Sequence, residues 1–447
     1  MSSAIQLFLL IVFSVVATGC EPELQGSGTL LDRGRKREAE LAPKTPQGRR
    51  EAPAPGPIAK KDGGEPNISV DKGTQTTFVF SAINPLASPW RGTIYGFDPE
   101  SGALSTILSG ESSDPAVYSA NGGAWLFNRA PDNSNMRVMK REPGQSFTST
   151  RQTHFAGAGS GDPHDILALN DTRLLLANYV EGNIATIDAT SGDLIETVSP
   201  DWDLPSGVLF HPEAFVQVTN HAGERFVLVI HQALGLRDGG IFVNGSQQIF
   251  VLRINGDHVT VVDMDETMPR VQGIHLKGSM PLPVRYGKRE RPLFVSMCSR
   301  YLTAGDRPDE MCHAAVEELD PETMKVKVLM DLDGKDLFMN GLVQPAWNET
   351  SFFASVERKI NDNKYAMEVV EIDTEAQSIK TIYEYFEQRF GGFWAMFSDV
   401  VHKRLFIGDM SDSSVGKFRA FVDGGVSYDV ALPMVPYSGV KIETALP

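Results

Sequence analysis

The chain lacks most of the features that would assign an activity directly. Its 447 residues include only three cysteines and five tryptophans, which excludes a dense disulfide framework. It has no Gly-x-Ser-x-Gly elbow, Walker loop, His-Glu-x-x-His pair or Gly-x-Gly-x-x-Gly loop. The usual sequence signatures of serine hydrolases, nucleotide-binding proteins, metalloproteases and dinucleotide enzymes are therefore absent. The formal net charge is −16. Because a negative electrostatic field repels nucleic acid, we do not expect nucleic acid as a partner.

One long apolar run is present, from Ala4 to Val16, and it leads into Ala17-Thr18-Gly19-Cys20. A run of about 13 residues is typical of a secretory signal and shorter than the ~20 residues of a membrane-spanning helix. Small residues before a cysteine resemble the bacterial lipobox. This predicts a signal peptide at 1–19, cleavage before Cys20, and a lipid anchor with palmitate on Cys20. Secretion with Cys20 unmodified and an uncleaved anchor are the alternatives. The resemblance implies an outer-membrane lipoprotein facing the periplasm or the surface.

The two remaining cysteines, Cys298 and Cys312, enclose a short loop. In an oxidising compartment such a pair is expected to form a disulfide. The alternative is two unpaired buried thiols. A zinc site is disfavoured, because His313 is the one obvious ligand nearby and a structural site needs four.

Residues 20–72 have the composition of a disordered tether. The segment is rich in proline, glycine and charge, and it contains few aromatic or β-branched residues with which to build a core. Its proline-rich part favours extended conformations, so we expect a semi-stiff spacer. The tether contains ten basic and nine acidic residues, which leaves a net charge of −17 on the rest of the chain.

From residue 73 to 447, short β-branched and aromatic runs alternate with Gly, Pro, Asp and Asn turns, which is typical of an all-β domain. A turn with Asp, Asn or Pro-Gly recurs near residues 98, 141, 188, 255, 320, 373 and 423. Seven four-stranded units of this size can bury their faces by packing around an axis, so the pattern predicts a seven-bladed β-propeller. Residues 75–110 supply three strands, and we expect Pro436–Glu443 to close the ring by joining blade one.

The units resemble the YVTN family of seven-bladed propellers and, more loosely, lactonase-like and quinoprotein-type propellers. The best match is the unit made of Pro163–Leu169, Leu174–Asn178 and Asn183–Asp188. This resemblance implies the fold and says little about activity. A quinone-dependent dehydrogenase is disfavoured, because the five tryptophans form no repeated docking pattern.

In propellers generally, the starts of the innermost strands and the ends of the second strands share one face, around the axial channel. Here those positions supply imidazole and carboxylate groups from neighbouring blades, a donor set that suits a divalent metal. The alternatives are turn-capping side chains, or contact with a small ligand or peptide. We expect no cofactor, with the metal as the open alternative. The candidate metal ligands are His164, Asp165, His211 and Glu213.

Two insertions, His231–Gln247 and Cys298–Cys312, lengthen adjacent units and should rise from the same face. A loop held by a disulfide binds with a smaller ordering cost, although such a bridge can also serve only to protect the loop. The sequence therefore predicts a binding module for a protein or peptide partner at the membrane. The alternative function is a metal-dependent hydrolase or lactonase at the channel mouth. The candidate binding residues are Arg129, Tyr179, His231, Arg300 and Tyr301.

Overall fold

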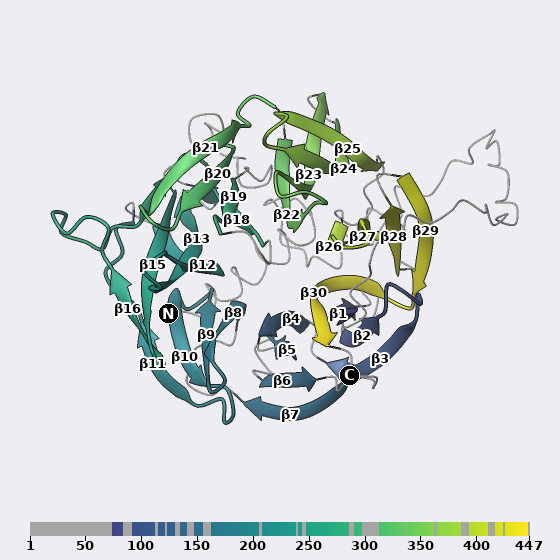
Figure 1. Cartoon of the computed structure of the whole chain (residues 1–447), viewed down its shortest axis with the longest axis horizontal. Helices are drawn as coiled ribbons and strands as arrows, with labels where there is room; N and C mark the ends of the chain where they lie inside the picture. Colours follow the sequence, from purple (N-terminus) through teal and green to yellow (C-terminus); the bar gives the residue numbers. More distant parts are fainter. Residues whose placement is uncertain are drawn as a thin grey trace, which may run out of the picture. The chain divides into compact units, whose positions relative to one another are not determined.

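Every regular element that the structure describes is a β-strand (Figure 1). The structure is a computed structural model. In the part of the chain that it describes, no helix is long and apolar enough to span a membrane. Cys20, Cys298, Arg300, Tyr301 and Cys312 lie outside the described residues, as do the signal segment and the tether. The described residues are 74–445 without 84–91, 112–114, 121–122, 130–134, 141–146, 155–161, 205–207, 238–239, 244–246, 286–289, 297–312, 336, 362–363, 386–392, 410–415 and 423–424.

The strands form seven antiparallel sheets around one axis, the blades of a β-propeller (Figure 1). Blade 1 consists of β1 (Thr74–Ile83), β2 (Gly92–Phe97), β3 (Leu104–Glu111) and β30 (Val435–Ala445). Blade 2 consists of β4 (Pro115–Ala120), β5 (Gly123–Asn128), β6 (Asn135–Lys140) and β7 (Thr148–His154). Blade 3 consists of β8 (Pro163–Asn170), β9 (Arg173–Asn178), β10 (Asn183–Asp188) and β11 (Leu194–Val198).

Blade 4 consists of β12 (Val208–Thr219), β13 (Arg225–Arg237), β14 (Gly240–Val243), β15 (Gln247–Asn255), β16 (His258–Val262) and β17 (Ile274–Leu276). Blade 5 consists of β18 (Pro281–Val284), β19 (Leu293–Ser296), β20 (Ala315–Asp320) and β21 (Lys325–Asp331). Blade 6 consists of β22 (Leu337–Pro345), β23 (Ser351–Asn361), β24 (Lys364–Asp373) and β25 (Ser378–Tyr385). Blade 7 consists of β26 (Phe393–Asp399), β27 (Arg404–Asp409), β28 (Gly416–Val422) and β29 (Gly425–Leu432). The predicted fold class is confirmed.

The chain closes its own ring. The order of strands in blade 1 is β3-β2-β1-β30, so the last strand of the chain is the innermost strand of the first blade. β30 pairs with β1 from Thr74 opposite Ala445 to Ile83 opposite Val435. This confirms the predicted closure, and it gives β1 the partner without which its inner edge would stay open.

The core lies mainly between blades, where the face of one sheet packs on the next. At the seam of blades 1 and 7, Phe78 stacks on Phe397 and Phe80 meets Phe418 edge-on, each pair with ring centroids 4.8 Å apart. Aromatic pairs of this kind contribute about 0.5–1.5 kcal/mol each beyond the area that they bury. The seam that joins the two ends of the propeller therefore has an aromatic core.

The predicted turns follow the third strands of the blades, as the turn after β10 shows. The Asp188 carboxylate accepts hydrogen bonds from the backbone N–H groups of Thr190 (2.7 Å) and Ser191 (2.8 Å). Gly192 then adopts a φ of 79°, which glycine reaches without steric cost. Local side-chain bonds and a glycine thus reverse the chain between β10 and β11.

Blade 4 departs from the four-stranded plan. β13 pairs with β15 up to Ile230 opposite Ile249, but it continues beside β12 and then beside β14 to Arg237. The predicted insertion from His231 is therefore an extension of the blade. The outer strand is divided, because β16 and β17 both pair with β15.

Candidate functional site

We call the end of the ring where the innermost strands begin and the second strands end the mouth face. On this face β8 and β12 each contain a β-bulge in the ladder to the next strand. The register shifts between Pro163 and Asp165 in β8, and between Pro212 and Ala214 in β12. The residues left between the paired positions are His164 and Glu213. Bulges redirect side chains, often beside functional sites.

Four charged side chains meet here, and we call them the mouth cluster: Arg129, Asp162, His164 and Glu213. His164 Nδ1 lies 2.7 Å from Glu213 Oε2, and its Nε2 lies 3.7 Å from Asp162 Oδ1. Arg129 Nε lies 3.7 Å from the same Asp162 oxygen. The exposed fractions of the side chains are 9% for His164, 14% for Arg129, 17% for Asp162 and 22% for Glu213. The two carboxylates are therefore the most accessible members.

The cluster holds His164 in its charged form. Burial alone would lower the pKa of this imidazole, but the charges of Glu213 and Asp162 outweigh burial and raise the pKa to about 9. Burial raises the pKa of Asp162, but His164 and Arg129 outweigh that effect and keep the pKa below its usual range. At neutral pH His164 is therefore a cation beside an anionic Asp162.

A stack of three rings supports the cluster from blades 3 and 4. The Tyr179 ring lies between His164, at a centroid distance of 4.0 Å, and His211, at 4.6 Å. The Tyr179 hydroxyl donates a hydrogen bond to Gln232 Oε1 (2.7 Å), and His211 Nδ1 donates to the Tyr179 carbonyl oxygen (3.0 Å). Burial and the charge of His164 lower the pKa of His211. The tyrosine thus separates a charged imidazole from a neutral one.

Of the four predicted metal ligands, the structure brings only His164 and Glu213 into contact. Asp165 Oδ2 accepts a hydrogen bond from the Phe215 N–H (2.7 Å) and forms an ion pair with Arg285. His211 bonds to the Tyr179 carbonyl. The four predicted ligands therefore do not converge on one point.

Among the described residues, one group of three ligand-type side chains has donor atoms within 4.8 Å of one another: Glu100, Asp399 and His402. The Arg404 guanidinium contacts both carboxylates, lying 2.7 Å from Asp399 Oδ2. This group therefore already contains a cation, supplied by the protein at the seam between blades 7 and 1.

The predicted binding residues fall into three groups. Arg129 belongs to the mouth cluster. Tyr179 and His231 are 0% and 1% exposed, so they support the mouth face and do not present a surface to a partner. His231 packs on Phe250 at a ring distance of 5.0 Å, and burial lowers its pKa to about 3. Arg300 and Tyr301 stay predictions.

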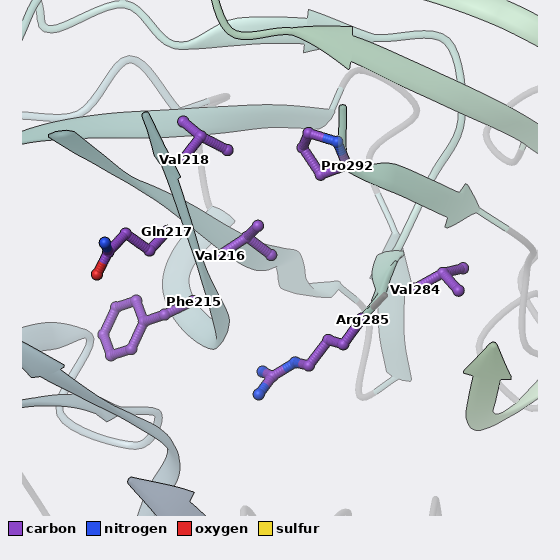
Figure 2. A pocket seen from close by; sticks show the side chains of 7 residues that line it. All are labelled: Phe215, Val216, Gln217, Val218, Val284, Arg285 and Pro292. Atoms are coloured by element: carbon purple, nitrogen blue, oxygen red, sulfur yellow. The ribbon is translucent and has the colours of Figure 1, made fainter. Parts of the chain in front are cut away.

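A small pocket of about 160 Å³ lies between the innermost strands of blades 4 and 5 (Figure 2). Five of its seven lining residues are apolar, and the half-exposed Arg285 lies at its side. Arg285 comes from blade 5 and reaches Asp165 of blade 3, which also caps the Phe215 N–H of blade 4. One buried carboxylate therefore links three blades. The lining residues are Phe215, Val216, Gln217, Val218, Val284, Arg285 and Pro292.

No protein-family model and no curated protein sequence matches this chain. Solved structures do match. A candidate 6-phosphogluconolactonase from Bacteroides fragilis is 12% identical, with a TM-score of 0.52 over 84% of this chain and 100% of its own. A periplasmic gluconolactonase from Pseudomonas aeruginosa is 12% identical, with a TM-score of 0.52 over 83% of this chain and 100% of its own. At such identity the likeness shows a shared β-propeller fold.

Proposed function

We propose that this protein is an exported propeller of YVTN type, anchored in the bacterial outer membrane through lipid on Cys20, that binds a protein or peptide partner with its mouth face. The sequence supports the anchor, through the apolar run and the small residues that precede Cys20. It also supports the tether that would separate a bound partner from the membrane.

The observation that carries the binding proposal is the extension of blade 4. Beyond the pair of Ile230 and Ile249, β13 leaves β15 and forms a three-stranded extension with β12 and β14. This extension begins at the mouth face, where Gln232 of β13 accepts a hydrogen bond from Tyr179, the residue after β9. A strand at the edge of such an extension offers backbone N–H and C=O groups to an extended peptide.

Site-specific photo-crosslinking in intact membranes tests this proposal. A crosslinker at position 241, in β14, should capture a partner, whereas one at the exposed Val328 of β21 should not. Tyr301→Ala and Cys298→Ser should weaken the capture, if the second insertion shares the interface. Identical crosslinks at positions 241 and 328 would contradict a mouth-face interface.

A second candidate function is a lactonase-type hydrolase at the mouth cluster, and the pair of His164 and Glu213 favours it. Of the proteins with a similar fold, one is named as a periplasmic gluconolactonase and one as a candidate 6-phosphogluconolactonase. In this scheme the Glu213 carboxylate takes a proton from water, the water oxygen bonds to the lactone carbonyl carbon, the ring C–O bond breaks, and the proton passes to the leaving ring oxygen. The product is a hydroxy acid, and His164 orients the carboxylate.

Hydrolysis of an aldonolactone, followed by acid release, tests the second candidate. Glu213→Gln should reduce the rate by about 10²-fold or more, since positioned acid–base groups contribute that much. A chelator, together with metal analysis of the wild type and of His164→Asn and His211→Asn variants, separates the metal-dependent scheme from this one. A rate that Glu213→Gln leaves unchanged would remove the carboxylate from the chemistry.

A further inference from the structure

The pocket between β12 and β18 has no role in the functions proposed above. Figure 2 shows Val216 and Val218 of β12 on one side of this pocket and Pro292 of blade 5 on the other. Val218 and Pro292 are buried, and Val216 is half-buried. The volume of about 160 Å³ is close to that of apolar cavities that bind benzene, about 150 Å³. The pocket therefore has room for an apolar group of about six carbon atoms.

We propose that this pocket binds a small monocarboxylate with an apolar body, and that Arg285 binds the carboxylate. A free carboxylic acid of about six carbon atoms and the C-terminal residue of a peptide both present this pair of groups. The proposal goes beyond the mouth-face interface, because it depends on neither the extension of blade 4 nor the mouth cluster.

The Arg285 guanidinium is held in place at the side of the pocket. Arg285 directly follows Val284, the last residue of β18, and its Nη2 donates to Asp165 Oδ2. The Asp165 side chain is only 5% exposed, and its Oδ2 also accepts a hydrogen bond from the Phe215 N–H (2.7 Å). Because blades 3 and 4 fix Asp165, the ion pair restricts the guanidinium before a ligand binds, which lowers the ordering cost of binding.

The same guanidinium has donors left for a ligand. An arginine side chain has several N–H donors and no acceptor, and Asp165 is the one ion-pair partner of Arg285 among the described residues. About half of the Arg285 side chain (53%) is exposed. A group that only donates requires an acceptor from the ligand, and the planar fork of arginine matches a carboxylate with parallel hydrogen bonds. The polar end of the ligand is therefore a carboxylate.

The charge of the whole domain opposes anion binding, but the sequence near Arg285 favours it. The net charge outside the tether is −17, and salt screens exposed charges that are more than about 8 Å apart at physiological ionic strength. Residues 285–291 include four basic side chains and one acidic side chain. A monoanion suits this position better than a phosphate, because a second negative charge increases the repulsion by the domain.

NMR titration of the purified protein at pH 7 with hexanoate, hexanol and acetate tests the proposal. Hexanoate has both the apolar body and the carboxylate, whereas hexanol lacks the carboxylate and acetate lacks the body. We expect hexanoate to saturate with a dissociation constant of about 1 mM or lower, and the other probes to bind about tenfold or more weakly. N-acetyl-leucine and its amide form a second arm. Tighter binding of N-acetyl-leucine than of hexanoate and of the amide identifies a peptide C-terminus as the ligand, and tighter binding of hexanoate identifies a free acid.

Variants test the carboxylate contact and the apolar contact separately. Arg285→Met should weaken hexanoate about tenfold or more, because it removes a charged hydrogen-bond donor, and should leave hexanol unchanged. Val216→Phe fills the pocket, so it should weaken hexanoate by a similar factor and leave acetate unchanged. Arg291→Met is the matched control, since Arg291 is equally exposed (53%) and does not line the pocket. Circular dichroism checks that each variant is folded.

The proposal is wrong if hexanoate does not saturate by about 10 mM, or if hexanol or acetate binds as tightly as hexanoate. A hexanoate affinity that Arg285→Met or Val216→Phe leaves unchanged would also overturn it. An equal loss in Arg291→Met would do the same, because it would show general attraction to a basic segment. None of these outcomes bears on the crosslinks at position 241, which test the mouth-face interface independently.

Discussion

The charged His164 should make the stability of the propeller fall as the pH rises above neutrality. Its pKa is about 9 in the folded protein, against 6.5 for an ordinary histidine, because Glu213 and Asp162 favour the cation. A raised pKa means that the folded state binds the proton more tightly than the unfolded state does. The resulting stabilisation is complete below pH 6.5 and is lost as the pH rises through 9. A shift of this size corresponds to about 3 kcal/mol.

Urea unfolding at several pH values between 6 and 10 measures this loss as a change in the free energy of unfolding. Glu213→Gln removes the carboxylate that favours the cation most, so the total decline in free energy should become about half as large. His258→Asn is the matched control, since His258 is an exposed histidine in the outer strand β16 and its removal should leave the decline unchanged. NMR titration of His164 should give a midpoint near 9. A midpoint at or below 6.5, or equal declines in wild type and Glu213→Gln, would refute the reasoning.

Three further predictions concern the ring. Truncation after residue 434 removes β30 and leaves blade 1 with three strands, so we expect thermal unfolding by circular dichroism to lose its cooperativity; an unchanged melting curve would contradict closure by this strand. Gly439→Ala would place a Cβ atom 2.6 Å from Phe80 Cβ, and such overpacking should cost about 1–3 kcal/mol in urea unfolding, with an unaltered midpoint as the contrary result. Arg285→Met should lower the free energy of unfolding by about 2 kcal/mol, because it leaves the buried Asp165 without its guanidinium partner. Arg291 is equally exposed (53%) but has more exposed partners, so Arg291→Met should lower it by less than about 1 kcal/mol. Equal losses in the two variants would argue against the link between blades.

The number of blades and the closure of the ring could be predicted from the sequence because both depend on local, repeated signals. The Asp188 turn makes its hydrogen bonds within four residues, so its sequence signal is local. Counting the expected strands also shows that the first unit lacks its innermost strand and that one strand follows the seventh unit. In each case the physical cause lies within one unit.

The candidate site could be predicted only in part, because its geometry depends on register and on contacts between blades. Alternation along β8 cannot show that a bulge separates His164 from Asp165, sending them to different partners. For this reason we predicted from the sequence that His164 and Asp165 bind a metal together with His211. No sequence pattern indicated a role for Arg285, because its partner Asp165 lies 120 residues away in the chain.

The closing strand ties the stability of the ring to the geometry of the mouth face. β30 is the strand that completes blade 1, and its ladder to β1 shifts register between Pro436 and Ser438, near the start of β30. The Ser438 hydroxyl also accepts a hydrogen bond from the Val117 N–H of blade 2 (3.2 Å). The strand that closes the ring therefore also joins blades 1 and 2, near the starts of their innermost strands. A partner that binds the mouth face of the closed ring alone would therefore add its binding energy to the stability of closure.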